Sequence, residues 1–290
     1  MSVDAVLEAL EPNIGPADAR SVRAVGGGSI NASYCFCTRD GSRYFLKLNA
    51  ADQLDMFAAE HDGLLELAAA EAVRVPEPIA TGTAGTQSYL LMEALDLGGH
   101  SGAAAAELGR RLARQHRTLR DEFGWHRDNT IGSTPQPNGW MKDWIGFLRE
   151  RRLGFQLQLA VRNGAASRVA ERGEELLERL PDFFADYQPD ASVLHGDLWG
   201  GNWGITADGE PVIFDPAVYF GDREADIAMT MLFGGFGAEF LEAYQSEWPL
   251  DNGFRRRVDL YNLYHVLNHY NLFGGGYQQQ AAAMLDGLLA

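Results

Sequence analysis

A change of pattern along the chain constrains the fold more than any other feature of its 290 residues. The first third carries short strand-like segments, and Asp40-Gly41 between two of them is a strong signal for a hairpin turn. Residues 51–72 repeat apolar side chains at helical spacing. This order predicts a small, mostly antiparallel sheet with one main helix, and strands are expected at residues 22–25, 31–38, 43–48, 78–81 and 87–92.

The remaining two thirds of the chain are predicted to be mainly helical. Helical patterns cover residues 103–119, 140–160 and 165–180, and helices resume near Ala225. Residues 121–139 read as a long loop, and loops of this length inside a domain are often functional. We therefore predict an α+β protein with a sheet lobe at residues 1–93, a hinge at 94–99 and a mostly helical lobe at 100–290.

Charge and cysteine content limit the possible partners. The formal net charge of −16 argues against a basic face that would bind nucleic acid. We find neither a signal-peptide pattern nor the roughly 18 consecutive apolar residues that a membrane span needs. The spacing of Cys35 and Cys37 suits neither a disulfide framework nor a zinc site. We expect a cytoplasmic protein, monomeric or weakly dimeric, without nucleic acid or membrane as a partner.

The most informative motif follows an apolar segment near the middle of the helical part. It reads His195-Gly196-Asp197, with Asn202 five residues after the aspartate and Asp215 at the end of a second apolar segment. Protein kinases place the same residue types at this spacing. Phosphoryl transfer needs a carboxylate beside the acceptor hydroxyl, and Mg²⁺ prefers carboxylate and amide oxygens. The motif predicts an ATP-dependent kinase in which His195 packs the loop rather than acting as acid or base.

Two features of the sheet lobe could serve a nucleotide. A glycine-rich segment lies between two predicted strands, where it could either cover phosphates or make a plain hairpin turn; its residues are Gly26, Gly27, Gly28, Ser29, Ile30 and Asn31. Lys47 interrupts an apolar strand, where it could either reach the α- and β-phosphates or extend from an edge strand into solvent. Its expected partner is Glu60, with Glu66 and Glu71 as alternatives.

The last predicted strand of the sheet ends where a hinge would follow. Glu93, Ala94 and Leu95 occupy this position. A hinge there would offer backbone N–H and C=O groups to adenine. The strand end alone is equally consistent with a simple connection, so this prediction depends on the order of the elements.

Taken in order, these motifs make the chain resemble the fructosamine kinase (ketosamine-3-kinase) family, within the protein-kinase-like superfamily that includes aminoglycoside and choline kinases. The resemblance runs nearly end to end, and Leu198-Trp199-Gly200-Gly201-Asn202 is more specific than the bare kinase loop. The other matching segments are residues 26–31, 45–47, 128–136, 215–217, 221–229 and 267–277.

The resemblance implies a two-lobed protein-kinase-like fold and a ketoamine substrate, phosphorylated on its sugar 3-hydroxyl. It implies that Asp197 is the catalytic base, that Asn202 and Asp215 bind Mg²⁺, and that Lys47 and Glu60 position ATP. It also implies adenine contacts through the backbone at the predicted hinge. Candidates for the acceptor pocket, each of which could equally serve ordinary packing, are Trp199, Trp203, Tyr219 and His269.

Several alternatives stay open on the sequence alone. Asp226 is either the helix aspartate that supports the 195–202 loop or an acid at a helix N-terminus. Asp215-Pro216-Ala217 replaces the Asp-Phe-Gly of protein kinases, which argues against a kinase switched by phosphorylation. Rival functions are a kinase for another small alcohol, such as an aminoglycoside, choline or homoserine, and a non-catalytic ATP-binding module.

Overall fold

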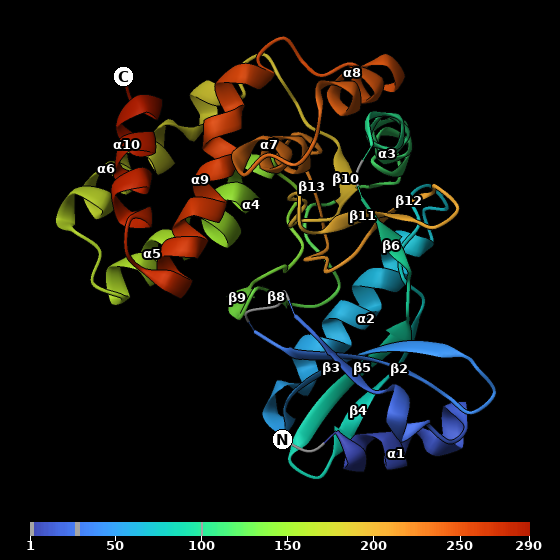
Figure 1. The fold of residues 1–290 in the computed structure, drawn as a ribbon. Coiled ribbons are helices and arrows are strands. Elements are labelled where there is room, and N and C mark those ends of the chain that lie inside the picture. Colours follow the sequence, from blue (N-terminus) through green and yellow to red (C-terminus); the bar gives the residue numbers. More distant parts are fainter. Residues whose placement is uncertain (1–2, 27–29, 100) are drawn as a thin grey trace.

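An antiparallel sheet forms the N-terminal part of the computed structural model, which describes residues 3–26, 30–99 and 101–290 (Figure 1). Its strand order is β1-β2-β3-β5-β4. The predicted turn between β2 and β3 is present, with Gly41 at a φ of +93° and the Asp40 carboxylate accepting the Ser42 N–H at 3.1 Å. The strands are β1 (Arg23–Val25), β2 (Ala32–Cys37), β3 (Arg43–Ala50), β4 (Pro78–Ala84) and β5 (Gln87–Glu93).

Helices cover both faces of this sheet. Val6 and Leu10 of the first helix pack with Leu46 and Leu48 of β3 in one apolar cluster. Because successive strand residues point to opposite faces, Lys47 lies on the other face, toward the second helix. The helices are α1 (Asp4–Ile14) and α2 (Leu54–Ala68), and 3-10 turns lie at Ala19–Ser21 and Ala51–Gln53.

The C-terminal part is mainly helical, as predicted. Helix α3 packs along α8, where Gly109 permits the contact: a Cβ at this position would lie 2.2 Å from the Phe240 carbonyl oxygen. Helix α9 packs against both α7 and α10. The helices are α3 (Gly102–Gln115), α4 (Trp144–Phe147), α5 (Gly154–Arg162), α6 (Ser167–Arg179), α7 (Glu224–Leu232), α8 (Ala238–Glu247), α9 (Phe254–Phe273) and α10 (Tyr277–Leu288), with a 3-10 turn at Leu180–Phe183.

Two predictions for this part need correction. The helix expected at 140–160 begins only at Trp144 and contains a π-helical stretch, Leu148–Leu153, between α4 and α5. The loop expected at 121–139 contains a short antiparallel hairpin of β8 (Asn129–Ile131) and β9 (Thr134–Gln136). Pro135 and Pro137 flank Gln136, which hid the hairpin because proline is uncommon in strands.

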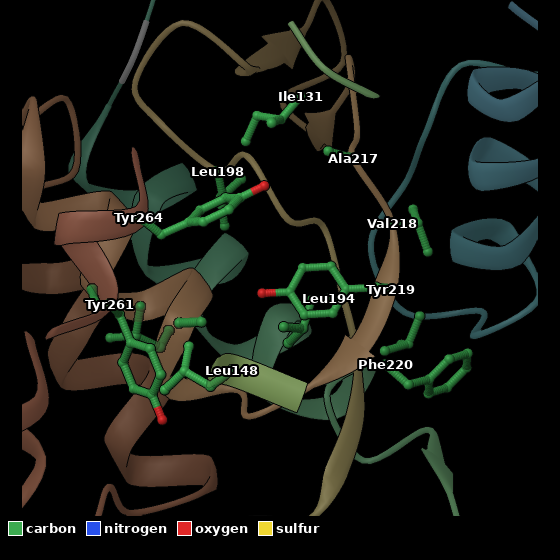
Figure 2. Packing of buried hydrophobic residues seen from close by; sticks show 14 of the residues in the cluster. Ile131, Leu148, Leu194, Leu198, Ala217, Val218, Tyr219, Phe220, Tyr261 and Tyr264 are labelled. Atoms are coloured by element: carbon green, nitrogen blue, oxygen red, sulfur yellow. The ribbon is translucent and has the colours of Figure 1, made fainter. Parts of the chain in front are cut away.

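Short strands flank the predicted motif residues. β10 (Ala191–Leu194) pairs with β7 (Leu119–Arg120) and with β13 (Tyr219–Gly221), and it leads into the 195–202 loop. β11 (Trp203–Thr206) pairs with β12 (Pro211–Ile213), and it also pairs with β6 (Leu97–Gly98), which lies in the predicted hinge. Figure 2 shows that Leu194, Tyr219, Tyr261 and Tyr264 contribute to the core beside these strands. The loop is thus supported by packed apolar side chains.

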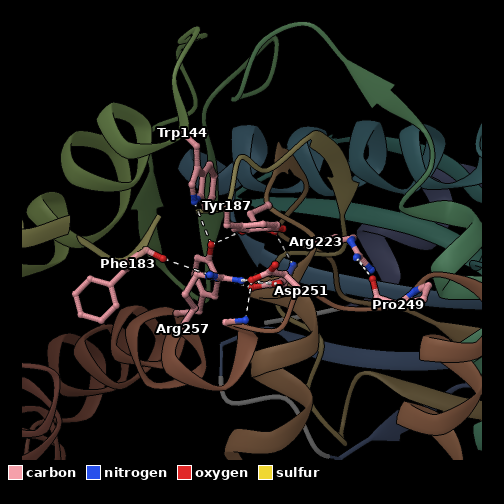
Figure 3. A network of polar contacts seen from close by, with 11 residues as sticks. Trp144, Phe183, Tyr187, Arg223, Pro249, Asp251 and Arg257 are labelled. Atoms are coloured by element: carbon pink, nitrogen blue, oxygen red, sulfur yellow. Dashed lines mark hydrogen bonds and ion pairs between the residues drawn. The ribbon is translucent and has the colours of Figure 1, made fainter. Parts of the chain in front are cut away.

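A buried polar network joins α7 to α9 (Figure 3). Arg257 donates to both carboxylate oxygens of Glu224, at 2.7 and 3.1 Å, and to the Phe183 carbonyl at 3.2 Å. The Tyr187 hydroxyl donates to Asp222 at 2.9 Å. The buried guanidinium therefore has an acid partner, without which its burial would be costly. Among the described residues, no helix has the length and apolar character that a membrane crossing requires.

Candidate active site

A cavity of about 720 Å³ lies between the sheet and the helical part. Its walls come from both parts of the chain, and they include most of the residues that the sequence singles out. Gly27, Gly28 and Ser29 lie outside the described residues. The predicted residues that line the cavity are Gly26, Ile30, Asn31, Lys47, Glu60, Glu93, Leu95, Asp197, Trp199, Asn202 and Asp215.

Lys47, which lines this cavity, is held between two carboxylates. Its Nζ lies 2.5 Å from Glu60 Oε1 and 2.6 Å from Asp215 Oδ1. Only 5% of Lys47 is exposed, and although burial opposes the charged form, the two neighbouring carboxylates raise its pKa overall. Lys47 is therefore a fixed cation, and the alternative partner Glu66 bonds the Trp125 indole instead.

Part of the backbone at the strand end after β5 is already hydrogen-bonded within the protein. The Glu93 N–H donates to the Glu77 carbonyl at 2.9 Å, and the Ala94 N–H donates to the Arg43 carbonyl at 3.4 Å. Among the described residues, the N–H of Leu95 has no hydrogen-bond acceptor. A purine in this part of the cavity could therefore use the Leu95 N–H, whereas those of Glu93 and Ala94 are already occupied.

Two hydrogen bonds of the His195 ring, one accepted and one donated, shape the 195–202 loop. Its Nδ1 accepts the Asp197 N–H at 3.2 Å, and its Nε2 lies 2.9 Å from the Phe214 carbonyl oxygen. This arrangement requires the proton on Nε2, and burial lowers the pKa of the imidazole, so the ring is neutral. His195 packs the loop, as predicted, and Asp197 of the same loop lines the cavity.

Asp226 supports the same loop from α7. Its Oδ2 accepts the His195 N–H at 2.7 Å, and its Oδ1 accepts the Gly196 N–H at 2.9 Å. His116, which directly follows α3, has its Nε2 3.2 Å from Oδ2, and its Nδ1 bonds the Tyr244 hydroxyl. Of the two readings of Asp226, the structure favours the loop support over a simple helix N-terminal acid.

The β11–β12 pairing brings Asn202 and Asp215 together. Trp203 pairs with Ile213, and the Phe214 N–H donates to the Asn202 carbonyl at 3.0 Å. Asp215 has a φ of +58°, a conformation that non-glycine residues seldom adopt, and about half of its side chain is exposed to the cavity. Such backbone strain is often found at functional sites.

These two side chains provide a donor set that fits Mg²⁺. The Asn202 Nδ2 faces the Asp197 carbonyl at 2.9 Å and its carboxylate Oδ2 at 3.5 Å, which leaves the amide oxygen free to bind a cation. Asp215 adds a carboxylate. Among the described residues, no group of three or more His, Cys, Asp and Glu side chains could hold a metal by itself. One amide and one carboxylate suit Mg²⁺, which usually completes its shell with substrate phosphates and water.

Asp197 has the electrostatics of a proton acceptor near neutral pH. Burial raises the pKa of its carboxyl to about 7, and the negative charges of Asp215 and Asp226 act in the same direction, against the Asn202 hydrogen bond. A carboxylate with a pKa near the working pH is well suited to accept a proton from a hydroxyl.

Of the predicted acceptor residues, Trp199 is exposed and His269 is half-buried. Trp199 is 41% exposed and lines the cavity. His269 lies outside the cavity lining, one helical turn after His265, and its ring contacts Phe233 at a centroid distance of 5.0 Å. Phe233 is itself 42% exposed. His269 thus lies in an aromatic cluster, with Phe273 and Tyr277 also beside its ring.

The other two acceptor predictions are wrong. Trp203 is 3% exposed and stacks on Phe236, because its strand position directs the ring into the core. Tyr219 is 4% exposed and packs under the Arg152 guanidinium, 3.9 Å from the ring centroid. Both side chains serve packing, and neither lines the cavity.

The sequence leaves open whether residues 129–136 position the acceptor or the 195–202 loop, and in the structure their side chains bond the segment after Asp215. Asn129 Nδ2 donates to the Val218 carbonyl at 2.9 Å, and Gln136 Nε2 donates to the Ala217 carbonyl at 3.1 Å. Tyr264 completes the set by donating to Gln136 Oε1 at 2.6 Å. The segment after Asp215 is thus held by buried amides, which no spacing in the sequence could reveal.

Comparisons with known proteins agree with this arrangement. A family model described as fructosamine kinase matches residues 3–290. A Synechocystis protein named probable ketoamine kinase is 48% identical over 265 residues, covering 91% of this chain and 88% of that protein. The chloroplastic protein-ribulosamine 3-kinase of Arabidopsis thaliana is 43% identical, with 92% and 82% covered.

Solved structures give the same answer for the fold. The crystal structure of a candidate fructosamine-3-kinase from Thermobifida fusca superposes with a TM-score of 0.88 at 30% identity, covering 99% of both chains. A choline kinase from Streptococcus pneumoniae gives a TM-score of 0.67 at 15% identity, covering 98% of both chains, and this likeness concerns the protein-kinase-like fold alone. The chain belongs to the fructosamine kinase family.

Proposed function

We propose that the protein transfers the γ-phosphoryl group of ATP to the 3-hydroxyl of a ketoamine, such as fructoselysine or ribuloselysine. Membership of a family of ATP-dependent phosphotransferases supports the reaction, and the names of its relatives support the acceptor. The observation that carries the proposal is the convergence of Lys47, Asp197, Asn202 and Asp215 on one cavity. A phosphate on the sugar would destabilise the adduct and allow the amine to be released.

Each side chain has a role that its contacts support. Asp197 orients the acceptor hydroxyl and accepts its proton late in the transfer. Lys47, kept in place by Glu60, offsets charge on the α- and β-phosphates once its contact with Asp215 gives way to nucleotide. Asn202 and Asp215 would hold Mg²⁺, which when bound neutralises phosphate charge. Positioning and charge stabilisation thus account for most of the catalysis.

ATP would lie between a lobe of residues 1–93 and a lobe of residues 100–290, with adenine against residues 93–95 at a hinge of residues 94–99. The glycine-rich segment would cover the phosphates, with Ile30 and Asn31 at its end in the cavity lining. Asn31 Oδ1 accepts from Asn49 Nδ2 at 2.7 Å, which ties this end of the segment to β3.

We also propose that the protein works in the cytoplasm as a monomer or weak dimer, without nucleic acid as a partner. Its free cysteines, Cys35 and Cys37, support a reducing compartment. Its net charge of −16 opposes contact with phosphate backbones.

A labelled-ATP transfer assay tests the proposal. The protein is incubated with Mg²⁺, ATP and, separately, fructoselysine, ribuloselysine, choline, homoserine and an aminoglycoside. We expect label on a ketoamine and loss of transfer in Asp197→Asn, while Asp208→Asn, a change at an exposed turn, keeps parental activity. Transfer to another alcohol, with none to either ketoamine, would refute the proposal that the acceptor is a ketoamine. Full activity of Asp197→Asn would refute the proposal that Asp197 is the catalytic base.

A further inference from the structure

His265 presents an unexplained buried polar atom beside the candidate base. The residue lies on α9 and is 5% exposed. Among the described residues, its Nδ1 is buried without a hydrogen-bond partner. A buried polar atom without a partner costs about 1–3 kcal/mol, so each one calls for a physical explanation. Asp197 supplies a candidate explanation, because its Oδ1 lies 3.9 Å from His265 Nδ1.

The groups around His265 determine its protonation state and its available hydrogen-bond partner. Burial lowers the pKa of His265 to about 3, so the ring is neutral and carries one proton, which either nitrogen can hold. His269, one turn further along α9, bonds the backbone carbonyl of His265 and not its ring. The Asp197 carboxylate has an amide donor near its other oxygen, since Asn202 Nδ2 lies 3.5 Å from Oδ2. Oδ1 is therefore the oxygen that still lacks a donor.

Direct contact between His265 Nδ1 and the acceptor is ruled out by burial. The Nδ1 atom has no significant exposure to solvent in this structure, and His265 is absent from the cavity lining. Any effect of the ring on the reaction therefore has to pass through Asp197. A separation of 3.9 Å is too long for a hydrogen bond, but a side-chain movement of about 1 Å would reach normal N–H···O distance.

We propose that His265 is a positioning residue whose Nδ1–H donates to Asp197 Oδ1 in the nucleotide-loaded enzyme, while Asn202 restrains Oδ2. The acceptor hydroxyl then meets a carboxylate whose orientation is fixed from both sides. This inference rests on the proposed function for the identity of the acceptor, but the hydrogen bond itself does not depend on which alcohol is phosphorylated.

Three substitutions separate this role from packing. His265→Asn places an amide where Nδ1 lies, His265→Gln places one near Nε2, and His265→Leu removes both polar atoms at similar volume. We expect leucine to lower kcat roughly tenfold while the KM for ATP stays parental, since a donor to a charged group is lost. Asparagine should keep kcat within about threefold of the parent, and glutamine should resemble leucine. A kcat that follows Tm alike in all three variants would overturn the proposal.

The proton position on the ring gives an independent measurement. Nitrogen-15 NMR of the full chain, loaded with Mg²⁺ and a non-hydrolysable ATP analogue, distinguishes the two neutral tautomers. The His265 signals are identified by their loss in His265→Asn. A proton on Nδ1 supports the proposal, and a proton on Nε2 overturns it. If the parent protein transferred no phosphate to any ketoamine, the proposed acceptor would be refuted. The proposal for His265 would still be decided by the position of the ring proton.

Discussion

Replacing Asp226 by asparagine should damage the site without touching the cavity. The carboxylate accepts the His195 and Gly196 N–H groups at 2.7 and 2.9 Å and is 2% exposed. Asparagine has one acceptor oxygen, so its NH₂ group must face one of these N–H donors. Losing one hydrogen bond to a charged group costs about 1.5–3 kcal/mol. If that cost falls on the placement of Asp197 in the transition state, kcat drops roughly ten- to hundredfold.

The same substitution should move the pH profile in a defined direction. Burial, then the charge of Asp215, then the charge of Asp226 raise the pKa of Asp197 to about 7. Removing the Asp226 charge lowers that pKa, and a base is active when deprotonated. The acid limb of kcat/KM, expected near pH 7 in the parent, should therefore shift to lower pH even as the plateau falls.

The assay is a pH series of ATP-dependent transfer, run with thermal unfolding of the same samples. Asp208→Asn is the matched control, because its side chain lies at an exposed turn and loses one charge in the same way. We expect Asp226→Asn to lower both kcat and Tm, and Asp208→Asn to change neither. Parental kcat and Tm in Asp226→Asn, or an acid limb that moves to higher pH, would refute this account of the loop.

Three further predictions concern packing and the acceptor surface. Arg257→Leu leaves Glu224 buried without its bidentate partner, so the free energy of unfolding in urea should fall by about 3–5 kcal/mol. Gly109→Ala forces a Cβ to within 2.2 Å of the Phe240 carbonyl oxygen, and separating α3 from α8 should cost about 1–3 kcal/mol in the same titration. Trp199→Ala removes an exposed wall of the cavity and should raise the ketoamine KM roughly three- to tenfold at parental Tm. Unchanged urea midpoints, or an unchanged KM, would contradict the respective argument.

Local periodicity explains why the sheet lobe could be predicted from the sequence. A strand alternates its faces, so one cation between Leu46 and Leu48 had to point away from their apolar cluster. A glutamate on the following helix was therefore the expected partner, and Glu60 Oε1 lies 2.5 Å from Lys47 Nζ. Asn202, five residues after Asp197, lies beside it in the loop, with its Nδ2 2.9 Å from the Asp197 carbonyl oxygen.

Aromatic residues near the motif could not be assigned in the same way. Trp199 and Trp203 lie four residues apart, yet the first is 41% exposed and the second 3%. The difference arises because Trp203 begins β11, whose pairing with Ile213 turns its ring inward to Phe236. The number of residues between a side chain and the kinase motif therefore does not tell whether that side chain lines the cavity or packs in the core. Tyr219, expected in the acceptor pocket, likewise begins a short strand, β13, and is buried.

The segment after Asp215 shows why the departure from the protein-kinase motif matters physically. Ala217 donates its N–H to the His195 carbonyl at 2.8 Å, and its own carbonyl accepts from Gln136. The Val218 carbonyl accepts from Asn129, so consecutive backbone groups are bonded to side chains of the β8–β9 hairpin. In protein kinases the corresponding region must be ordered by phosphorylation. Here buried amides supply the ordering, and a buried amide network cannot be released without leaving several polar groups unpaired. The physical consequence is a site in which the segment after Asp215 is positioned by the fold itself.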